Sequence, residues 1–346
     1  MMNRYKLQPE LKKCLKMTEL PSHEYISTLA ENASSVLENE LTSYRPADMN
    51  GKPGSLLELN NLPAIIVPDL HARPFFLADI LKYKLSFSFC GSDDFVFNKI
   101  TVEQALEEKL INVICVGDAI HTELTSERWG CIENEFANGK HCGSFMKTEM
   151  KECLSALSVV MTLKCMYREN FHFLKGNHEN ILNETADGDF AFCKYADEGE
   201  MVKTFISEYY GDDVLYLISC WEKALPLAVY GSNFVVSHAE PEAAYTRQQL
   251  IDARYNPDVV SGLIWTRNGQ VKDNTAEKII NNLIESKNAA ESFYFAGHRP
   301  VYSKYALRQN GRFIQIHNPR CENIALVSNK KIFNPEIDIV GVGHEQ

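Results

Sequence analysis

The histidines of this chain stand where imidazole side chains could bind a metal ion. The 346 residues include ten histidines, and four of them each follow a short apolar run and lie beside Asp, Asn, Ser or Gly. These four are His71, His178, His238 and His298. A single histidine at the end of a strand is more often an ordinary polar residue than a ligand. Because imidazole is the commonest metal-binding side chain, four such placements indicate a metal site.

Carboxylates and an amide accompany these histidines. Asp69 precedes His71 by two residues, Asp118 follows a glycine, and Asn177 precedes His178. Carboxylate, amide and imidazole ligands together suit Mn, Fe, Zn or Mg, and the lack of a thiolate in the set argues against a structural zinc site of the cysteine type. The predicted ligands are Asp69, His71, Asp118, Asn177, His238 and His298.

Short apolar runs precede these polar clusters. The runs are residues 64–67, 112–116, 171–174, 234–236 and 293–295, and stretches of helical periodicity lie between them at 75–84, 149–168 and 274–286. Strand, polar loop and helix in this order are typical of an α/β fold whose site lies at strand ends. Three later runs, at 312–316, 323–327 and 331–333, predict strands that extend or face the sheet.

The composition is that of an ordinary globular protein. Apolar residues make up 45% and charged residues 23%, and the formal net charge is -11, with no cluster of cations. Binding to duplex nucleic acid is therefore not expected. The ten cysteines include no CxxC pair, which favours reduced, mostly buried thiols. Because no signal-like or membrane-length apolar run is found, we expect a cytoplasmic protein that does not bind membranes.

The first 58 residues differ from the rest. They mix polar and apolar residues at helical spacing, and a loop-like stretch from Arg45 to Gly54 follows. We therefore expect a helical N-terminal extension over 1–58 and one domain over 59–346.

Five motifs in this order resemble those of the calcineurin-like metallophosphoesterases. The motifs are Pro68-Asp69-Leu70-His71, Gly117-Asp118, Gly176-Asn177-His178-Glu179, Ser237-His238-Ala239-Glu240 and Gly297-His298-Arg299-Pro300. The last motif lacks the second histidine of the GHxH form, which makes the chain more similar to the phosphoprotein-phosphatase branch and its bacterial relatives. The resemblance covers residues 69–298.

The resemblance implies a four-layer β-sandwich flanked by helices, with two divalent metal ions at the loop ends. Asp69 and His71 would bind the first ion, Asp118 would bridge both, and Asn177, His238 and His298 would bind the second. Two such ions activate a water molecule as the nucleophile, so no Ser or Cys nucleophile is needed. His178 would protonate the leaving alkoxide. The implied activity is hydrolysis of a phosphate ester, either a phosphomonoester or a phosphoprotein.

The second motif departs from the resembled pattern. Phosphoprotein phosphatases have GDxxDRG there, whereas this chain has His121 and Thr122 in place of the second aspartate and the arginine. In the family that aspartate favours the protonated form of the catalytic histidine, and His121 brings no negative charge. Three interpretations stay open. They are an enzyme of low or acid-shifted activity, a carboxylate supplied from elsewhere such as Glu123, and a non-catalytic metal-binding scaffold or phosphate sensor.

The cations that would contact phosphate are also changed. Lys175 stands where an arginine often precedes the GNHE motif, and lysine lacks bidentate geometry. Arg267, in Ile264-Trp265-Thr266-Arg267, is the leading candidate, and Arg73 and Arg299 are secondary ones. The interval between Asp118 and Asn177 predicts an insertion near 122–149, which is either a lid or specificity element or a surface excursion.

A second enzyme class fits the same motifs. A hydrolase of nucleotides or dinucleoside polyphosphates would need a site closed around a small molecule, whereas a protein phosphatase needs a groove open to a peptide. In both cases the expected partner is a phosphorylated substrate.

Overall fold

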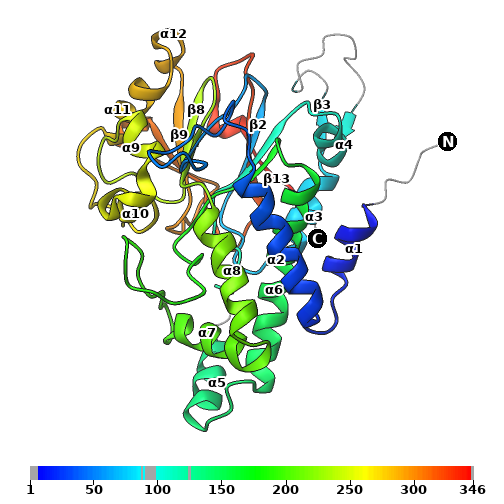
Figure 1. Cartoon of the computed structure of the whole chain (residues 1–346). Coiled ribbons are helices and arrows are strands. Elements are labelled where there is room, and N and C mark those ends of the chain that lie inside the picture. The colour runs from blue at the N-terminus through cyan, green and yellow to red at the C-terminus, as the bar shows by residue number, and fades with distance from the viewer. Residues whose placement is uncertain (1–6, 87–88, 90–98, 124–125, 344–346) are drawn as a thin grey trace, which may run out of the picture.

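Two β-sheets lie face to face, and helices cover both outer faces of the pair (Figure 1). The computed structural model describes residues 7–86, 89, 99–123 and 126–343. The arrangement of helix, sheet, sheet and helix confirms the predicted four-layer sandwich of α/β type.

One sheet has five strands in the order β13-β12-β2-β5-β6. Strands β2, β5 and β6 are parallel, and β12 pairs antiparallel with β2. The bounds are β2 Ala64–Val67, β5 Asn112–Cys115, β6 Phe171–Phe173, β12 Asn323–Val327 and β13 Ile339–Gly341. Because parallel strands end at the same edge of a sheet, the loops after β2, β5 and β6 converge there.

The other sheet has six strands in the order β1-β7-β8-β9-β11-β10. Strands β8, β9 and β11 are parallel neighbours, so their carboxyl ends also share one edge. The bounds are β1 Leu56–Glu58, β7 Ala228–Tyr230, β8 Phe234–Ser237, β9 Phe293–Ala296, β10 Ala306–Arg308 and β11 Phe313–Gln315. A separate antiparallel pair consists of β3 Lys84–Ser86 and β4 Lys99–Thr101.

Strand β2 is apolar along its whole length, and β8 is apolar up to Ser237, because both faces of each strand are buried. In β2, Ile65 and Val67 belong to the core shared with helices, whereas Ile66 belongs to the core between the sheets. In β8, Val235 packs toward the helices on the opposite side of the molecule, and Val236 packs between the sheets.

The helices form two groups. The group that shares a core with the five-stranded sheet is α1 Pro9–Leu15, α2 His23–Glu38, α3 Pro74–Lys82, α4 Val102–Glu107, α5 Ser126–Ala137, α6 Ser144–Met166, α7 Glu198–Tyr209 and α8 Asp212–Ala224. The group that covers the six-stranded sheet, yellow and orange in Figure 1, is α9 Arg247–Ile251, α10 Pro257–Ile264, α11 Thr275–Leu283 and α12 Ser286–Ala289. Short 3-10 turns occur at Ala253–Tyr255 and Gln309–Gly311, and α13 spans Pro335–Asp338.

The N-terminal segment packs into the first group of helices. Helices α1 and α2 contact α6, and α2 also lies along α8. Glu40, which follows α2, accepts a hydrogen bond from Arg45 and another from Lys164, each at 2.5 Å. All three side chains are at most 3% exposed. Buried charges of this kind persist only when they are paired, so this cluster ties the segment after α2 to α6.

Most predicted elements agree with the structure to within a few residues, although α6 begins at Ser144, five residues before the predicted start at 149. The predicted strand 331–333 is wrong, because Asn334 and Pro335 begin α13 directly after it and the Asn334 side chain accepts the Glu336 amide N–H at 3.1 Å. The predicted helix 274–286 ends at Leu283, where Ile284 becomes extended, and the separate helix α12 follows.

The structure also bears on the expected burial of the cysteines and on whether any helix could cross a membrane. The nine cysteines within the described ranges are unpaired thiols, and three of them, Cys14, Cys115 and Cys153, are fully buried. The expectation that most are buried is therefore wrong, because four are partly exposed and two are exposed: Cys131, Cys142, Cys165 and Cys220, and Cys193 and Cys321. Among the described helices, none is long and apolar enough to cross a membrane.

Candidate metal centre

The six residues predicted as metal ligands lie at one edge of the sandwich. Asp69 and His71 follow β2, and Asp118 and Asn177 follow β5 and β6 of the same sheet. In the facing sheet, His238 directly follows β8 and His298 follows β9. The structure therefore brings together side chains that are up to 229 positions apart in the sequence.

Asp118 occupies the middle of this group. Its Oδ2 atom lies 3.4 Å from Nε2 of His238, 3.6 Å from Nε2 of His71 and 3.9 Å from Nε2 of His178. Its Oδ1 atom accepts the backbone N–H of His178 at 3.0 Å. One carboxylate thus faces imidazoles from both sheets, as a bridging ligand requires.

Asn177 and Asp69 complete the connection between the sheets. Oδ1 of Asn177 lies 2.9 Å from Nε2 of His238 and 2.9 Å from Nδ1 of His298. Oδ2 of Asp69 accepts the backbone N–H of His298 at 2.9 Å. Oδ1 of Asp69 is buried and has no hydrogen-bond partner among the described residues.

Three groups of buried side chains bring possible ligand atoms within 4.8 Å of one another. They are Asp69 with Asp118 and His238, Asp69 with His71 and His317, and His71 with His121 and His178. Within the described part of the chain, Nδ1 of His178 and Nδ1 of His317 also lack hydrogen-bond partners. Buried polar atoms without partners are rare in proteins. Their presence here, on the Asp69 carboxylate and on imidazoles, fits the binding of divalent metal ions.

Burial prepares these groups for a cation. Burial is the largest cause that lowers the pKa of His71, His238 and His298, and neighbouring histidines add to it. Burial, followed by the negative charges of Glu179 and Asp69, raises the pKa of Asp118 well above its usual value. The imidazoles are therefore neutral, which is the form that binds metals, and a dication would offset the charge of ionised Asp118.

The backbone at this edge is strained. His71, Asp118, His121 and His298 have positive φ angles of 41°, 55°, 74° and 60°. A residue other than glycine in this region costs about 1–3 kcal/mol, and such residues cluster at functional sites. Of the eleven described residues other than glycine that have a positive φ, five are these four and Ala72, so the strain is concentrated at the candidate centre.

Glu179 holds two of the strained loops together. Its carboxylate accepts the backbone N–H groups of Asp118 and Ala119 at 2.8 Å each and that of Gly176 at 2.7 Å. The loops also touch at Gly117, which has φ 126° and where a Cβ would lie 2.7 Å from the Gly176 nitrogen. The loop after β5 and the loop after β6 are therefore fixed relative to each other.

His178 is buried among aromatic rings and lies beside Asp118. Its ring stacks on His121 with centroids 4.7 Å apart and also contacts Phe192 at 4.6 Å. Burial, followed by His121 and His71, lowers the pKa of His178 well below its usual value. This direction agrees with the effect expected when His121 replaces an aspartate.

A carboxylate does approach His121, and it comes from Glu198 at the start of α7. Its Oε1 atom lies 3.5 Å from Nε2 of His121. Although burial favours its neutral form, the nearby His121 imidazole and hydrogen bonds from the backbone amides of Lys194 and Tyr195 lower the pKa of Glu198. The proposed alternative, Glu123, does not take this position. No pattern near residue 198 pointed to this role.

Glu123 instead contacts the other side of the centre. Its Oε2 atom lies 2.7 Å from Nε2 of His317, and its Oε1 atom lies 3.4 Å from Nε2 of His71 and 2.5 Å from Nζ of Lys194. His317 was missed in the sequence, although it directly follows the predicted strand 312–316, which is the same signal that identified the other histidines.

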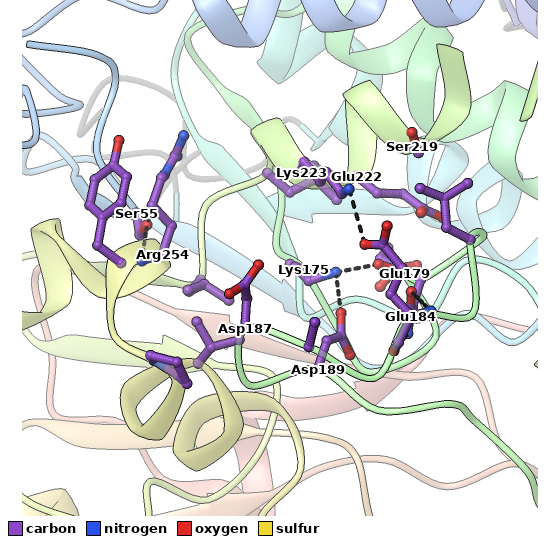
Figure 2. A pocket seen from close by; sticks show the side chains of 18 of the residues that line it. Ser55, Lys175, Glu179, Glu184, Asp187, Asp189, Ser219, Glu222, Lys223 and Arg254 are labelled. Carbon is purple, nitrogen blue, oxygen red and sulfur yellow. Dashed lines mark hydrogen bonds and ion pairs between the residues drawn. The ribbon is translucent and has the colours of Figure 1, made fainter. Parts of the chain in front are cut away.

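The candidate cations differ in where they lie. Lys175 lines a cavity of about 600 Å³ together with Glu222 and Arg254, and its side chain points toward Asp189 and Glu179 (Figure 2). There Nζ of Lys175 meets Asp189 at 2.9 Å and the carbonyl of Glu179. The described residues that line this cavity do not include any of the six predicted ligands, so the structure does not bring the Lys175 ammonium group to the centre.

The three arginines differ as well. Arg73 lines a cavity of about 140 Å³ with His71 and Glu123, and its guanidinium group donates to the carbonyls of Leu70 and Asp69. The side chains of Arg267 and Arg299 are exposed.

The segment near 122–149 forms α5 and the beginning of α6 and packs against the centre. The Thr122 hydroxyl donates to Glu149 of α6 at 2.6 Å, and Arg128 also pairs with Glu149 at 2.9 Å. Trp129 is fully buried and stacks on His121 with centroids 5.1 Å apart.

Solved structures, but no family model or curated protein, match this chain. Among solved structures, a protein serine/threonine phosphatase from Saccharomyces cerevisiae, with similarity to human phosphatase PP5, covers 92% of this chain and 89% of its own, with 13% identity and a TM-score of 0.55.

Two further solved structures are less similar. A cold-active protein tyrosine phosphatase covers 78% of this chain and 75% of its own, with 12% identity and a TM-score of 0.42. A candidate diadenosine tetraphosphatase covers 79% and 93%, with 17% identity and a TM-score of 0.38. The fold assignment therefore depends on the yeast structure. The chain has the fold of that serine/threonine phosphatase, in agreement with the resemblance of its five motifs to calcineurin-like metallophosphoesterases.

Proposed function

We propose that this protein is a phosphoesterase that hydrolyses a phosphate ester with the help of two divalent metal ions. The observation that supports this function is the convergence of carboxylate, amide and imidazole side chains from both sheets at one buried, strained edge. In our proposal Asp69 and His71 hold one ion, Asp118 bridges, and Asn177, His238 and His298 hold the other. When bound, the ions supply an activated water and offset the charge of the phosphate.

The remaining residues have proposed roles of their own. His178, whose Nε2 lies 3.9 Å from Asp118, gives a proton to the leaving alkoxide as a general acid. His121, stacked on His178 and paired with Glu198, keeps that ring in place. Among the candidate cations, we favour Arg73 as the phosphate contact because it lines a cavity with His71. Arg267 and Arg299 remain candidates, and Lys175 is the weakest because Asp189 already pairs with it.

The test uses protein that has been stripped of metal with a chelator. We expect no turnover of p-nitrophenyl phosphate without metal and recovery when Mn²⁺, Fe²⁺, Zn²⁺ or Mg²⁺ is added, with Mn²⁺ the first to try. Metal analysis should find two ions per chain. A protein that binds ions but turns over neither this ester nor any other phosphate compound would instead be a scaffold or phosphate sensor.

The substrate is identified by a second experiment. Phosphopeptides, nucleotides, dinucleoside polyphosphates and phosphodiesters are compared at equal concentration. We propose a phosphomonoester, with phosphoprotein as the first candidate. Preference for dinucleoside polyphosphates would establish the alternative.

For the cell, we expect a cytoplasmic location, where dispersed thiols stay reduced.

A further inference from the structure

His317 lies among the candidate ligands without being one of the six. It is fully buried, and its ring centroid is 5.2 Å from that of His71. One ring nitrogen, Nε2, lies 2.7 Å from Oε2 of Glu123. Because a carboxylate only accepts hydrogen bonds, this contact places a hydrogen on Nε2.

The other nitrogen of His317 points to the centre. Nδ1 has no hydrogen-bond partner in the described ranges, and the carboxylate oxygen facing it, Oδ2 of Asp69, is 3.7 Å away. That separation is too long for a hydrogen bond. An unshared pair on nitrogen that faces a carboxylate oxygen in a buried place is unfavourable unless a cation lies between them.

The spacing fits one ion. Nε2 of His71 lies 3.8 Å from the same Asp69 oxygen that His317 faces at 3.7 Å. An ion about 2.1 Å from each ligand atom can join two atoms that are up to about 4.2 Å apart. Asp69, His71 and His317 satisfy that limit in both measured pairs, and their ligand atoms all lie within 4.8 Å of one another.

His317 is also held as the neighbouring histidines are. Nδ1 of His71 pairs with the His121 carbonyl at 3.0 Å, and Nδ1 of His238 pairs with the Val116 carbonyl at 3.1 Å. In each ring, one nitrogen meets an oxygen atom and the other points to the centre. Histidines that bind metals are usually oriented in this way, by a carbonyl or carboxylate on the second nitrogen. Glu123 does this for His317 and is itself paired with Lys194 at 2.5 Å.

We propose that His317 is a ligand of the first metal ion and that Glu123 is the residue that positions it. This inference rests on the proposed function, because it assumes that metal ions bind at this edge. Each ion would then have two imidazoles as well as oxygen ligands, from His71 and His317 on one side and from His238 and His298 on the other. Imidazole ligands suit Zn or Fe, whereas Mg prefers oxygen ligands, so the first site should discriminate against Mg²⁺.

The test measures metal binding to the full chain by titration calorimetry with Mn²⁺ and with Zn²⁺. We expect two sites in the unchanged protein. His317→Gln should weaken one of them by at least about 10²-fold and leave the other, and Glu123→Gln should weaken the same site by about 10- to 100-fold. His172→Gln is the matched control, because His172 is an equally buried histidine whose Nε2 meets only the Glu169 carbonyl. It should leave both sites intact.

The outcomes separate the two hypotheses. If the unchanged protein binds no metal, the proposed function fails, and this inference fails with it. If it binds two ions and His317→Gln binds both with unchanged affinity, only the role of His317 is refuted. Should His317→Gln fail to fold, His317→Cys loaded with Co²⁺ decides. A thiolate-to-cobalt absorption band absent from the unchanged protein supports coordination at position 317, and lack of that band refutes it.

Discussion

Gly297 offers a direct test of whether Asp69 is a metal ligand. A Cβ atom at this position would lie 1.7 Å from Oδ1 and 2.8 Å from Cγ of Asp69, and 2.9 Å from Cγ2 of Val116. Ordinary contact begins at 3.4 Å, so Gly297→Ala requires the carboxylate to retreat by about 1.7 Å, against a tolerance of about 0.2 Å in metal–ligand distances. The retreat would also break the hydrogen bond from the His298 amide to Oδ2 of Asp69.

We expect Gly297→Ala to weaken the first metal site by at least about 10²-fold, as a displaced ligand should. The strained packing should also lower the free energy of unfolding by roughly 1–3 kcal/mol. Titration calorimetry with Mn²⁺ measures the first effect, and urea unfolding of the metal-free protein measures the second. Gly130→Ala is the control, because it lies in α5 and, apart from its chain neighbours and the helix's own backbone, no described heavy atom lies within 4 Å of the added methyl group. Two sites of unchanged affinity in folded Gly297→Ala would refute Asp69 as a ligand.

Four further predictions concern catalysis and pH. Asp118→Asn should reduce the metal content and nearly abolish hydrolysis, because the charge between two dications is lost; metal analysis with an ester assay checks both. His178→Asn should keep both ions yet slow esters with poor leaving groups by about 10²- to 10⁴-fold, and nitrophenyl esters less; equal losses would make His178 a structural residue. Because the pKa of His178 is lowered and the general acid must be protonated, activity should begin to fall at an unusually low pH and should decrease further as the pH rises. His121→Asp should shift this limb of the rate profile to higher pH, whereas Glu123→Gln should leave it in place. Burial, opposed by Lys175, raises the pKa of Glu222 to about 8. Between about pH 4.5 and 8 the folded protein therefore keeps this proton, whereas the unfolded chain has lost it. The free energy of unfolding should therefore decrease over that range, and Glu222→Gln should remove this part of the decrease in urea titrations at pH 5 and pH 8.

The strands and the polar residues after them were predictable from sequence because both depend on local signals. Mostly apolar runs such as 64–67 and 112–116 reflect strands buried on both faces. Residues that follow parallel strands must converge, so the positions of Asp69, Asp118 and His238 followed from their place in the chain. The same rule would have found His317, which follows β11, had it been applied to that strand.

Other features of the centre could not be predicted because they depend on tertiary packing. Glu198 reaches His121 only because α7 packs beside the loop after β5, and residues 121 and 198 share no local pattern. The direction of the Lys175 side chain is likewise decided by Asp189, fourteen positions later. The strand expected at 331–333 failed because Pro335 and the Asn334 cap favour a helix start directly after it.

The order of the strands has a consequence for the making of the protein on the ribosome. Strand β2 lies between β5 and β12, and β12 begins only at residue 323. In the same way, α2 packs against α8 and β1 pairs with β7, and both partners are synthesised much later. At about 5–20 residues per second, roughly 13 to 50 seconds separate the synthesis of β2 from that of β12. During that time one edge of an apolar strand is unpaired, and such an edge can pair with another chain. The edge of β2 that β12 covers therefore stays open for longer during synthesis than it would in a chain of the same length built from local contacts.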